Sequence, residues 1–394
     1  MKRWLPILLM VSSLATLALA CNLGSSAPTG SESASASATT GVGTIVAATS
    51  SIPTSTPNTT TGSALPAGTL ILSQAGNPLA QVPNATGQTI SLTAEHFGNQ
   101  ASPDGRYGVR VVPNNKLFDL LLVDFSTSTA DPGKAIPQGT GLSGPEITWK
   151  DDTSGFAFFD IPADASTNKG ILYYDLASGQ TKQIVPAPTE PATVASSIAF
   201  SPDGKYFVYA LGKTEGNVSG QGANGPLNKT FLLDSTTNQG TALPDGSGDF
   251  TQWMKDSKRF VTQRFNNDGT SQIVVYSMGD LNNPKVITPA KTSDFLVDGS
   301  PDSKYLVVTS LPSGQAAQQP AQIYISNLDG SNRKALTKFT NTDQSITGLV
   351  WGNSGIYYSV TGADNQETTW RMDLDGTNAA QVAQGTLNGI VGER

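Results

Sequence analysis

The stretch FSPDGKYFVYA, Phe200 to Ala210, places a tight turn between a short apolar segment and a run of aromatic and β-branched residues. Pro202 fixes φ at the first corner of a turn, Asp203 can hydrogen-bond to nearby backbone, and Gly204 can adopt positive φ. The residues from Tyr206 to Tyr209 suit a pleated, mostly buried strand. The stretch therefore predicts a strand, a tight turn and a second strand.

This turn recurs along the chain at a regular spacing. The residue equivalent to Asp203 is, in successive units, Asp104, Asp152, Asp203, Asp256, Asp302 and Asn353, and the differences between them are 48, 51, 53, 46 and 51. Each unit continues with a second hairpin, so that it contains four β segments, which we call strands a, b, c and d. A four-strand unit with a period near 50 is typical of a β-propeller blade rather than of a sandwich. The composition agrees, because 14% charged residues with 40 Gly and 24 Pro favour an all-β chain rich in turns.

The units resemble the TolB-type and WD-like propeller repeats of bacterial extracytoplasmic proteins. The resemblance rests on SPDG before an aromatic or aliphatic strand and on IYISNLDGSNRKALT, and it covers residues 69–394. It implies a propeller fold and little about activity, because a fold does not bring a site with it. The separate N-terminal α/β domain of TolB has no counterpart here, so the role of TolB in an envelope complex is not implied.

The number of blades depends on residues 69–93, which precede the first complete unit. ATGQT at 85–89 matches ASGQT at 177–181, which is a turn between strands c and d. The match identifies the segments of 69–93 as strands b, c and d of a further blade. The C-terminal TLNGIVGER, residues 386–394, can supply the missing strand a, and such a closure leaves no free sheet edge. We predict a seven-bladed propeller of four-stranded blades, closed by N- and C-terminal strands. Six blades is the alternative if 69–93 lies outside the ring.

The N-terminus predicts export. Residues 1–20 have a basic start, an apolar core and a small-residue cleavage site, as in a secretory signal peptide. Cys21, the only cysteine, follows directly. LALAC resembles the lipobox of bacterial lipoproteins, although Ala18 stands where that family usually has Leu. The resemblance implies that Cys21 is lipidated and that the protein is extracytoplasmic, anchored to the bacterial cell membrane by lipid. A soluble secreted protein is the alternative.

Residues 21–68 are rich in Ser, Thr, Ala, Gly and Pro, as in SSIPTSTPNTTTG. A segment of this composition buries too little apolar surface to fold. We predict a disordered tether with a reach of roughly 40 Å between the lipidated cysteine and a propeller domain of residues 69–394.

Several classes of site are not supported by the sequence. A formal net charge of −7 disfavours nucleic acid as a partner. His96 is the only histidine, so neither a zinc site nor a nucleophilic triad is predicted, and no Gly-x-Ser-x-Gly elbow is visible. NLDGSN at 327–332 and DLDGTN at 373–378 resemble the start of a calcium loop, but we predict that both are hairpin turns. We therefore predict no cofactor, no metal ligand and no catalytic residue.

For four tryptophans we predict a structural rather than a functional role. Trp149, Trp253 and Trp351 recur at the end of strand a, which predicts packing between blades, and Trp370 is predicted to be in the core.

The longest insertions fall in loops that a propeller places on one face. The b–c loops and the d–a connections share a face around the channel mouth, whereas the a–b and c–d turns on the other face are short. Variable loops on a rigid ring are where binding residues gather. The candidate binding residues in two long b–c loops are Gly212, Asn217, Gln221, Asn224, Asn228, Gln315 and Gln318.

These observations favour a non-enzymatic binding or scaffold module for an envelope protein or glycan, held at the membrane by its lipid. The alternative is a propeller enzyme, a lyase or glycoside hydrolase, which uses paired carboxylates at the channel mouth.

Overall fold

A computed structural model describes most of the propeller. The described residues are 64–74, 77–81, 89–91, 97–115, 117–126, 133–142, 145–160, 169–187, 193–213, 221–222, 225–226, 229–244, 251–266, 270–312, 319–342 and 344–393. The predicted signal peptide, Cys21, His96 and all of the predicted tether before residue 64 lie outside them. Within these ranges the protein has only strands and turns, and none of it forms a helix that could cross a membrane.

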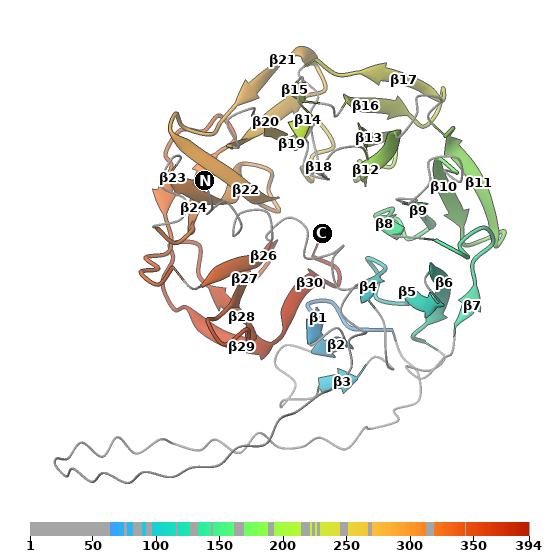
Figure 1. Ribbon diagram of the computed structural model, residues 1–394, viewed down its shortest axis with the longest axis horizontal. Coiled ribbons are helices and arrows are strands. Elements are labelled where there is room, and N and C mark those ends of the chain that lie inside the picture. The colour runs from blue at the N-terminus through green and yellow to red at the C-terminus, as the bar shows by residue number, and fades with distance from the viewer. Residues whose placement is uncertain are drawn as a thin grey trace, which may run out of the picture.

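Seven four-stranded antiparallel sheets are arranged in a ring (Figure 1), which confirms the predicted all-β propeller with seven blades. In blade order, from strand a to strand d, they are β30 (Thr386–Ile390), β1 (Leu70–Gln74), β2 (Asn77–Gln81) and β3 (Thr89–Ser91); β4 (Phe97–Ala101), β5 (Tyr107–Asn114), β6 (Leu117–Asp124) and β7 (Lys134–Ala135); β8 (Pro145–Trp149), β9 (Gly155–Asp160), β10 (Ile171–Asp175) and β11 (Gln180–Val185); β12 (Thr193–Phe200), β13 (Tyr206–Lys213), β16 (Lys229–Asp234) and β17 (Gln239–Ala242); β18 (Thr251–Trp253), β19 (Arg259–Phe265), β20 (Ser271–Ser277) and β21 (Asp280–Val286); β22 (Thr292–Gly299), β23 (Tyr305–Pro312), β24 (Gln322–Asn327) and β25 (Lys334–Ala335); and β26 (Ser345–Gly352), β27 (Gly355–Thr361), β28 (Glu367–Met372) and β29 (Ala380–Gln384). A small ribbon of β14 (Gln221–Gly222) and β15 (Gly225–Pro226) stands apart from the blades.

The ring is closed in blade 1 by strands from both ends of the described chain. The C-terminal β30 pairs antiparallel with β1, with Leu70 opposite Ile390 and Leu72 opposite Leu387. The sheet order β3–β2–β1–β30 matches the predicted one, with the C-terminal strand innermost. Leu65, just before β1, is also buried and donates its N–H to the carbonyl of Gly105 in blade 2 at 2.8 Å. Both ends therefore tie blade 1 to its neighbours.

The SPDG turn is built as a closed hydrogen-bonding unit. Ser201 is fully buried; its hydroxyl donates to Asp203 at 2.7 Å and accepts the N–H of Tyr206 at 2.9 Å. The N–H of Gly204 donates to the carbonyl of Ser201 at 2.8 Å, and Gly204 has a φ of +68°. Asp203 also accepts the N–H of Lys205 at 3.1 Å. The residues of the motif thus serve the turn, as the sequence predicted.

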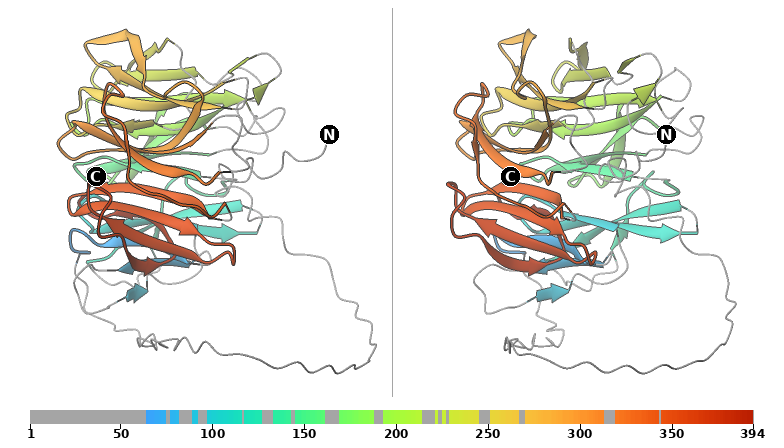
Figure 2. Two further views of the ribbon diagram at one scale, coloured as in Figure 1. Left: turned by 90° about the vertical axis from the view of Figure 1, so that its left-hand side faces the viewer. Right: turned by 60° about the vertical axis from the view of Figure 1, so that its left-hand side comes forward.

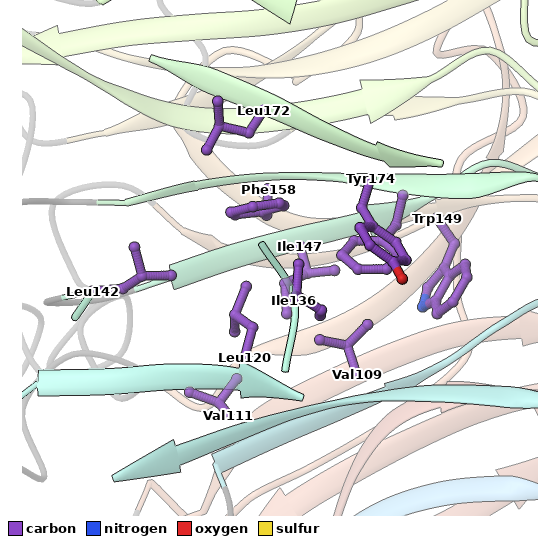
Figure 3. Close-up of a cluster of buried hydrophobic side chains, with 11 residues drawn as sticks. Val109, Val111, Leu120, Ile136, Leu142, Ile147, Trp149, Phe158, Leu172 and Tyr174 are labelled. Carbon is purple, nitrogen blue, oxygen red and sulfur yellow. The ribbon is translucent and has the colours of Figure 1, made fainter. Parts of the chain in front are cut away.

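The core lies between the blades rather than within one of them. Figure 3 shows one such layer, in which Val109 and Leu120 of blade 2 face Phe158 and Tyr174 of blade 3. Trp149 completes this layer and is 1% exposed.

Two of the other tryptophans follow the prediction, whereas Trp370 is less buried than predicted. Trp253 packs against blade 4 and Trp351 against blade 6, and both are buried. Trp370 is half-buried at the edge of the layer between blades 6 and 7. The recurring tryptophans are therefore packing residues between blades.

Neighbouring blades are also tied by hydrogen bonds between their a–b turns. The hydroxyl of Ser257 accepts the N–H of Asp203 at 3.0 Å, and the hydroxyl of Ser303 accepts the N–H of Asp256 at 3.0 Å. Both serines have positive φ, 55° and 58°, in the position that Gly204 occupies in blade 4. A serine here accepts some backbone strain and gains a contact with the preceding blade.

Candidate functional site

The predicted binding residues fall largely outside the described structure. Gly212 lies in β13 opposite Val194, and Gln221 lies in the β14–β15 ribbon opposite Pro226. Cys21, Asn217, Asn224, Asn228, Gln315 and Gln318 lie outside the described residues. The candidate site in the described part of the protein therefore consists of residues that were not predicted.

A groove of about 610 Å³ lies on blade 6, on the face of the b–c loops and d–a connections. We call this face the loop face and the opposite one the turn face. The loop face can be found in the edge-on view of Figure 2 (left) from the cyan β5–β6 hairpin, whose end is a b–c loop. The hairpin extends to the right, so the loop face lies on the side away from the C-terminus. The lining residues of the groove, hereafter the blade-6 groove, are Pro289, Thr292, Ser310, Leu311, Pro312, Gln319, Pro320, Gln322, Tyr324, Arg333, Phe339 and Thr340. The b–c loop that contains the predicted residues Gln315 and Gln318 thus contributes its two flanks, residues 311–312 and 319–320, to the lining.

The floor of the groove holds a buried ion pair. Both Nη atoms of Arg333 donate to the two carboxylate oxygens of Asp294, at 2.9 and 2.7 Å. The Asp294 side chain is 0% exposed and that of Arg333 12%. The guanidinium also lies over the ring of Tyr324, 4.6 Å from its centroid. A bidentate pair stacked on an aromatic ring has a fixed geometry, so this part of the floor is rigid.

The wall toward blade 7 is fixed by the amide of Gln322. Its nitrogen donates to the carbonyl of Phe339 at 2.8 Å, and its oxygen accepts the N–H of Phe339 at 2.8 Å and the hydroxyl of Thr337 at 3.0 Å. Phe339 in turn lies edge-on to Tyr358, with centroids 6.2 Å apart. The blade 6 to blade 7 connection is therefore held in one conformation at the groove.

The groove combines ring surfaces with a few polar groups. Tyr324, Phe339 and three prolines supply apolar faces, whereas Thr292, Gln319 and Thr340 supply hydroxyl and amide groups near the rim. A volume between about 300 and 1,000 Å³ with this mixture is typical of sites for small molecules or short polymer segments. The arrangement is suited to binding.

A second hollow, of about 390 Å³, lies on the turn face. Its lining includes Asp104, Asp151 and Asp152 from the a–b turns of blades 2 and 3. Asp152 accepts the N–H and the hydroxyl of Ser154, and these bonds lower its pKa although burial acts in the opposite direction. Asp151 pairs with Lys255 of blade 5 at 3.7 Å. Among the described residues, no group of three or more His, Cys, Asp or Glu side chains is placed to hold a metal ion.

The a–b and c–d turns account for many of the acidic residues. Asp329 and Asp375, in the two calcium-like sequences, each accept the N–H and the hydroxyl of the residue two positions later. These bonds lower the pKa of both carboxyls. Both sequences form turns between strands c and d, as predicted.

Two carboxyl groups on innermost strands have raised pKa values. Burial raises the pKa of Asp298 in β22 to about 6, despite N–H donation from Trp351 and Gly299 at 2.7 Å and from the amide of Gln252. Asp298 thereby joins blades 5, 6 and 7 at their inner strands. The pKa of Glu146 in β8 is also raised, because the surrounding protein removes water although the side chain keeps an exposed surface. Neither residue lines the blade-6 groove.

Sequence reasoning missed the groove because its key contacts join distant residues. Because Arg333 follows a c–d turn, its sequence context indicates a solvent-exposed side chain. The context of Asp294 indicates only a polar residue in strand a. Their pairing spans 39 positions of the chain and depends on the twist of blade 6. The available signal was the long b–c loop between Leu311 and Pro320. It indicated that binding residues lie on the loop face, but it did not indicate the ion pair at the floor of the groove.

The fold defines the protein as a seven-bladed β-propeller closed by strands from both ends, with a groove on its loop face. Similar solved structures include one of two prolyl endopeptidases, with a TM-score of 0.60 and 14% identity, over 81% of this chain and 50% of that one. They also include the propeller domain of the Trilobed protease from Pyrococcus furiosus, which has an open velcro topology (TM-score 0.53, 11% identity, 79% of this chain and 92% of that one). TolB from Acinetobacter baumannii is similar with a TM-score of 0.46 and 18% identity, over 81% and 80% of the two chains.

The likeness at these identities concerns the fold. The chain spans about half the length of the prolyl endopeptidase that it matches. No protein-family model matches the sequence, and no curated protein sequence matches it.

Proposed function

We propose that the protein is an extracytoplasmic binding module that holds its ligand in the blade-6 groove. The observation that carries the proposal is the groove itself, which has a volume of about 610 Å³. Its lining contains two half-buried aromatic rings and Arg333, whose guanidinium is held in a pre-formed ion pair with the buried Asp294. A site whose side chains are already fixed loses little conformational entropy when a ligand binds. The ring around it supplies that rigidity, because each blade packs against two others.

The charge of the groove lining also supports binding. Arg333 is the one charged residue of the described lining, and Asp294 beneath it is engaged by both Nη atoms. Chemistry of the glycosidase type would use two carboxyl groups on either side of a scissile bond. No carboxyl group is among the described lining residues, so the alternative enzyme would need a site other than this groove.

The proposal includes the lipid anchor, which places the propeller outside the cytoplasm at the membrane. Its basis is the apolar segment of residues 5–20 followed by Cys21. Two or three acyl chains would hold the protein stably at a bilayer. Cys21→Ser should release the protein from the membrane fraction or leave it unprocessed. A processed variant that still fractionates with the membrane would contradict lipidation.

Site-specific photocrosslinking in the native cell tests the binding face. A photoreactive residue at Thr340, exposed at the groove, should give a discrete adduct, whereas one at Lys304 on the turn face should not. Lys304 is a matched control because it lies in the same blade and its side chain is 69% exposed. Equal adducts at both positions, or none at Thr340, would refute a ligand at the loop face.

A further inference from the structure

The charge of the blade-6 groove limits the class of ligand that it can hold. Among the lining residues that the structure describes, only Arg333 is charged, and its two Nη atoms donate to Asp294 at 2.9 and 2.7 Å. The pair is neutral as a whole. The protein carries a net charge of −7, so an anionic ligand would be repelled at longer range. The described lining also offers no carboxylate to pair with a cationic ligand, so a ligand that matches this floor is uncharged.

The surfaces of the groove limit the ligand further. Tyr324 and Phe339 are half-buried, so each ring keeps part of its surface for a ligand. Pro289, Pro312 and Pro320 add apolar faces around them. Thr340 and Gln319 are exposed beside these rings and carry groups that can both donate and accept hydrogen bonds. This combination suits a molecule with apolar faces and many hydroxyl groups at its edges.

A polypeptide bound by strand addition is a poorer match. That mode needs a strand edge with unpaired N–H and C=O groups. The groove instead crosses β22, β23 and β24, and each of these pairs with its neighbours. Beyond the two residues of β25, the outer edge of β24 stays covered, because the N–H of Ile323 donates to the Thr337 hydroxyl and the N–H of Leu336 to the carbonyl of Ile323. Recognition here depends on side chains.

We propose that the blade-6 groove binds an uncharged glycan, which packs against Tyr324 and Phe339 and hydrogen-bonds to Thr340 and Gln319. The proposal rests on the proposed function and adds the chemical class of the ligand. Sugar rings offer C–H faces to the aromatic rings and hydroxyls to the rim, which matches the uncharged and amphipathic lining.

Isothermal titration calorimetry on the purified full chain tests the class of ligand. The probes are maltohexaose, cellohexaose and chitohexaose, with hexagalacturonate as the anionic comparison. We expect at least one neutral hexasaccharide to bind with a Kd below 1 mM, at least tenfold tighter than hexagalacturonate. Failure of all three neutral probes to bind, or tighter binding of the anionic one, overturns the glycan proposal. Retention of the Thr340 adduct in cells would then show that the proposed function stands without it.

Substitutions locate the binding site. Tyr324→Ala should weaken binding at least tenfold, whereas Tyr324→Phe, which keeps the ring, should change it less than threefold. Gln319→Ala combined with Thr340→Ala should weaken binding at least threefold and, since both residues are exposed, should leave the fold intact. Tyr305→Ala is the matched control: Tyr305 is 40% exposed at the other end of blade 6. Equal affinity in the Tyr305 variant and the groove variants would place the glycan elsewhere and refute the proposal.

Discussion

The substitution Leu387→Ala tests whether β30 holds the whole ring together. Leu387 is 4% exposed and shares a buried cluster with Leu70, Leu72 and Ile390, where the two ends of the chain meet. Loss of a buried leucine side chain costs about 2–5 kcal/mol of unfolding free energy, depending on how far the cavity collapses. For a domain of this size we expect the melting temperature to fall by about 3–8 °C.

Removal of residues 387–394 is the stronger form of the same test. It takes away Leu387, Ile390 and Val391, all of which are at least 94% buried. Burial of each aliphatic side chain is worth about 1.5–3 kcal/mol, so the loss is about 5–9 kcal/mol before any hydrogen bond of the β30–β1 ladder is counted. That is similar to the total stability of many domains, about 5–15 kcal/mol. We expect the truncated protein to lose cooperative unfolding near its original temperature.

Calorimetry combined with hydrogen exchange distinguishes global weakening from local fraying. Because the blades stabilise one another through their interfaces, β13 and β19, in blades 4 and 5, should lose protection together with β1. Leu374→Ala is the control, since Leu374 is 50% exposed and its loss should change stability by less than about 0.5 kcal/mol. An unchanged melting curve after truncation, or exchange that rises only in blade 1 and its neighbours, would refute the joint closure.

Three further predictions follow from buried contacts. Arg333→Met should destabilise the protein by about 3–5 kcal/mol in denaturant unfolding, because it leaves the Asp294 carboxyl at 0% exposure without the guanidinium. The double variant Asp294→Leu/Arg333→Met should recover most of that loss, and equal costs for the single and double variants would contradict this account. The pKa of Asp298 is raised to about 6, so the stabilisation that its protonated form contributes should be complete below about pH 4. About 3 kcal/mol of it should be lost as pH rises from about 4 through 6. Asp298→Asn should remove this part of the pH profile of the melting temperature, and an unaltered slope between about pH 4 and 6 would show that another group causes it. Ser303→Ala should lower the free energy of unfolding by about 1 kcal/mol more than Ser303→Gly. Both variants lose the hydroxyl that accepts the N–H of Asp256, but only glycine adopts the φ of +58° without strain. The reverse order in thermal unfolding would contradict this account.

The fold could be predicted in detail because its determinants are local and repeated. The turn at Ser201 to Tyr206 is set by residues within five positions of one another, and the same pattern recurs near residues 104 and 302. The closing strand was also predictable, because the match between ATGQT and ASGQT fixed the register of the incomplete blade. Short-range turn chemistry together with a count of units was sufficient for the architecture.

The candidate site could not be predicted in the same way. The pairing of Asp294 with Arg333 and the bonds of the Gln322 amide to Thr337 and Phe339 depend on how blade 6 twists and on where its connection to blade 7 lies. Asp294 stands in none of the recurring stretches. Arg333 lies within IYISNLDGSNRKALT, but nothing in that stretch indicates that it pairs with a residue of strand a. The polar residues that bring a blade its particular chemistry are the ones that the repeat does not specify.

The two kinds of contact have different consequences for how this propeller could acquire a function. The turn hydrogen bonds and the tryptophan layers recur from blade to blade, so they stabilise the ring without distinguishing one position in it. The ion pair at Asp294 and Arg333 and the bonds of the Gln322 amide have no equivalent in the described parts of the other blades, and they fix side chains around an open groove on the loop face of blade 6. A buried ion pair is weak evidence for stability, because well-packed apolar residues of similar volume can be equally stable. We therefore interpret its fixed geometry over the ring of Tyr324 as the support of the proposed binding surface rather than as a device that holds the blade together.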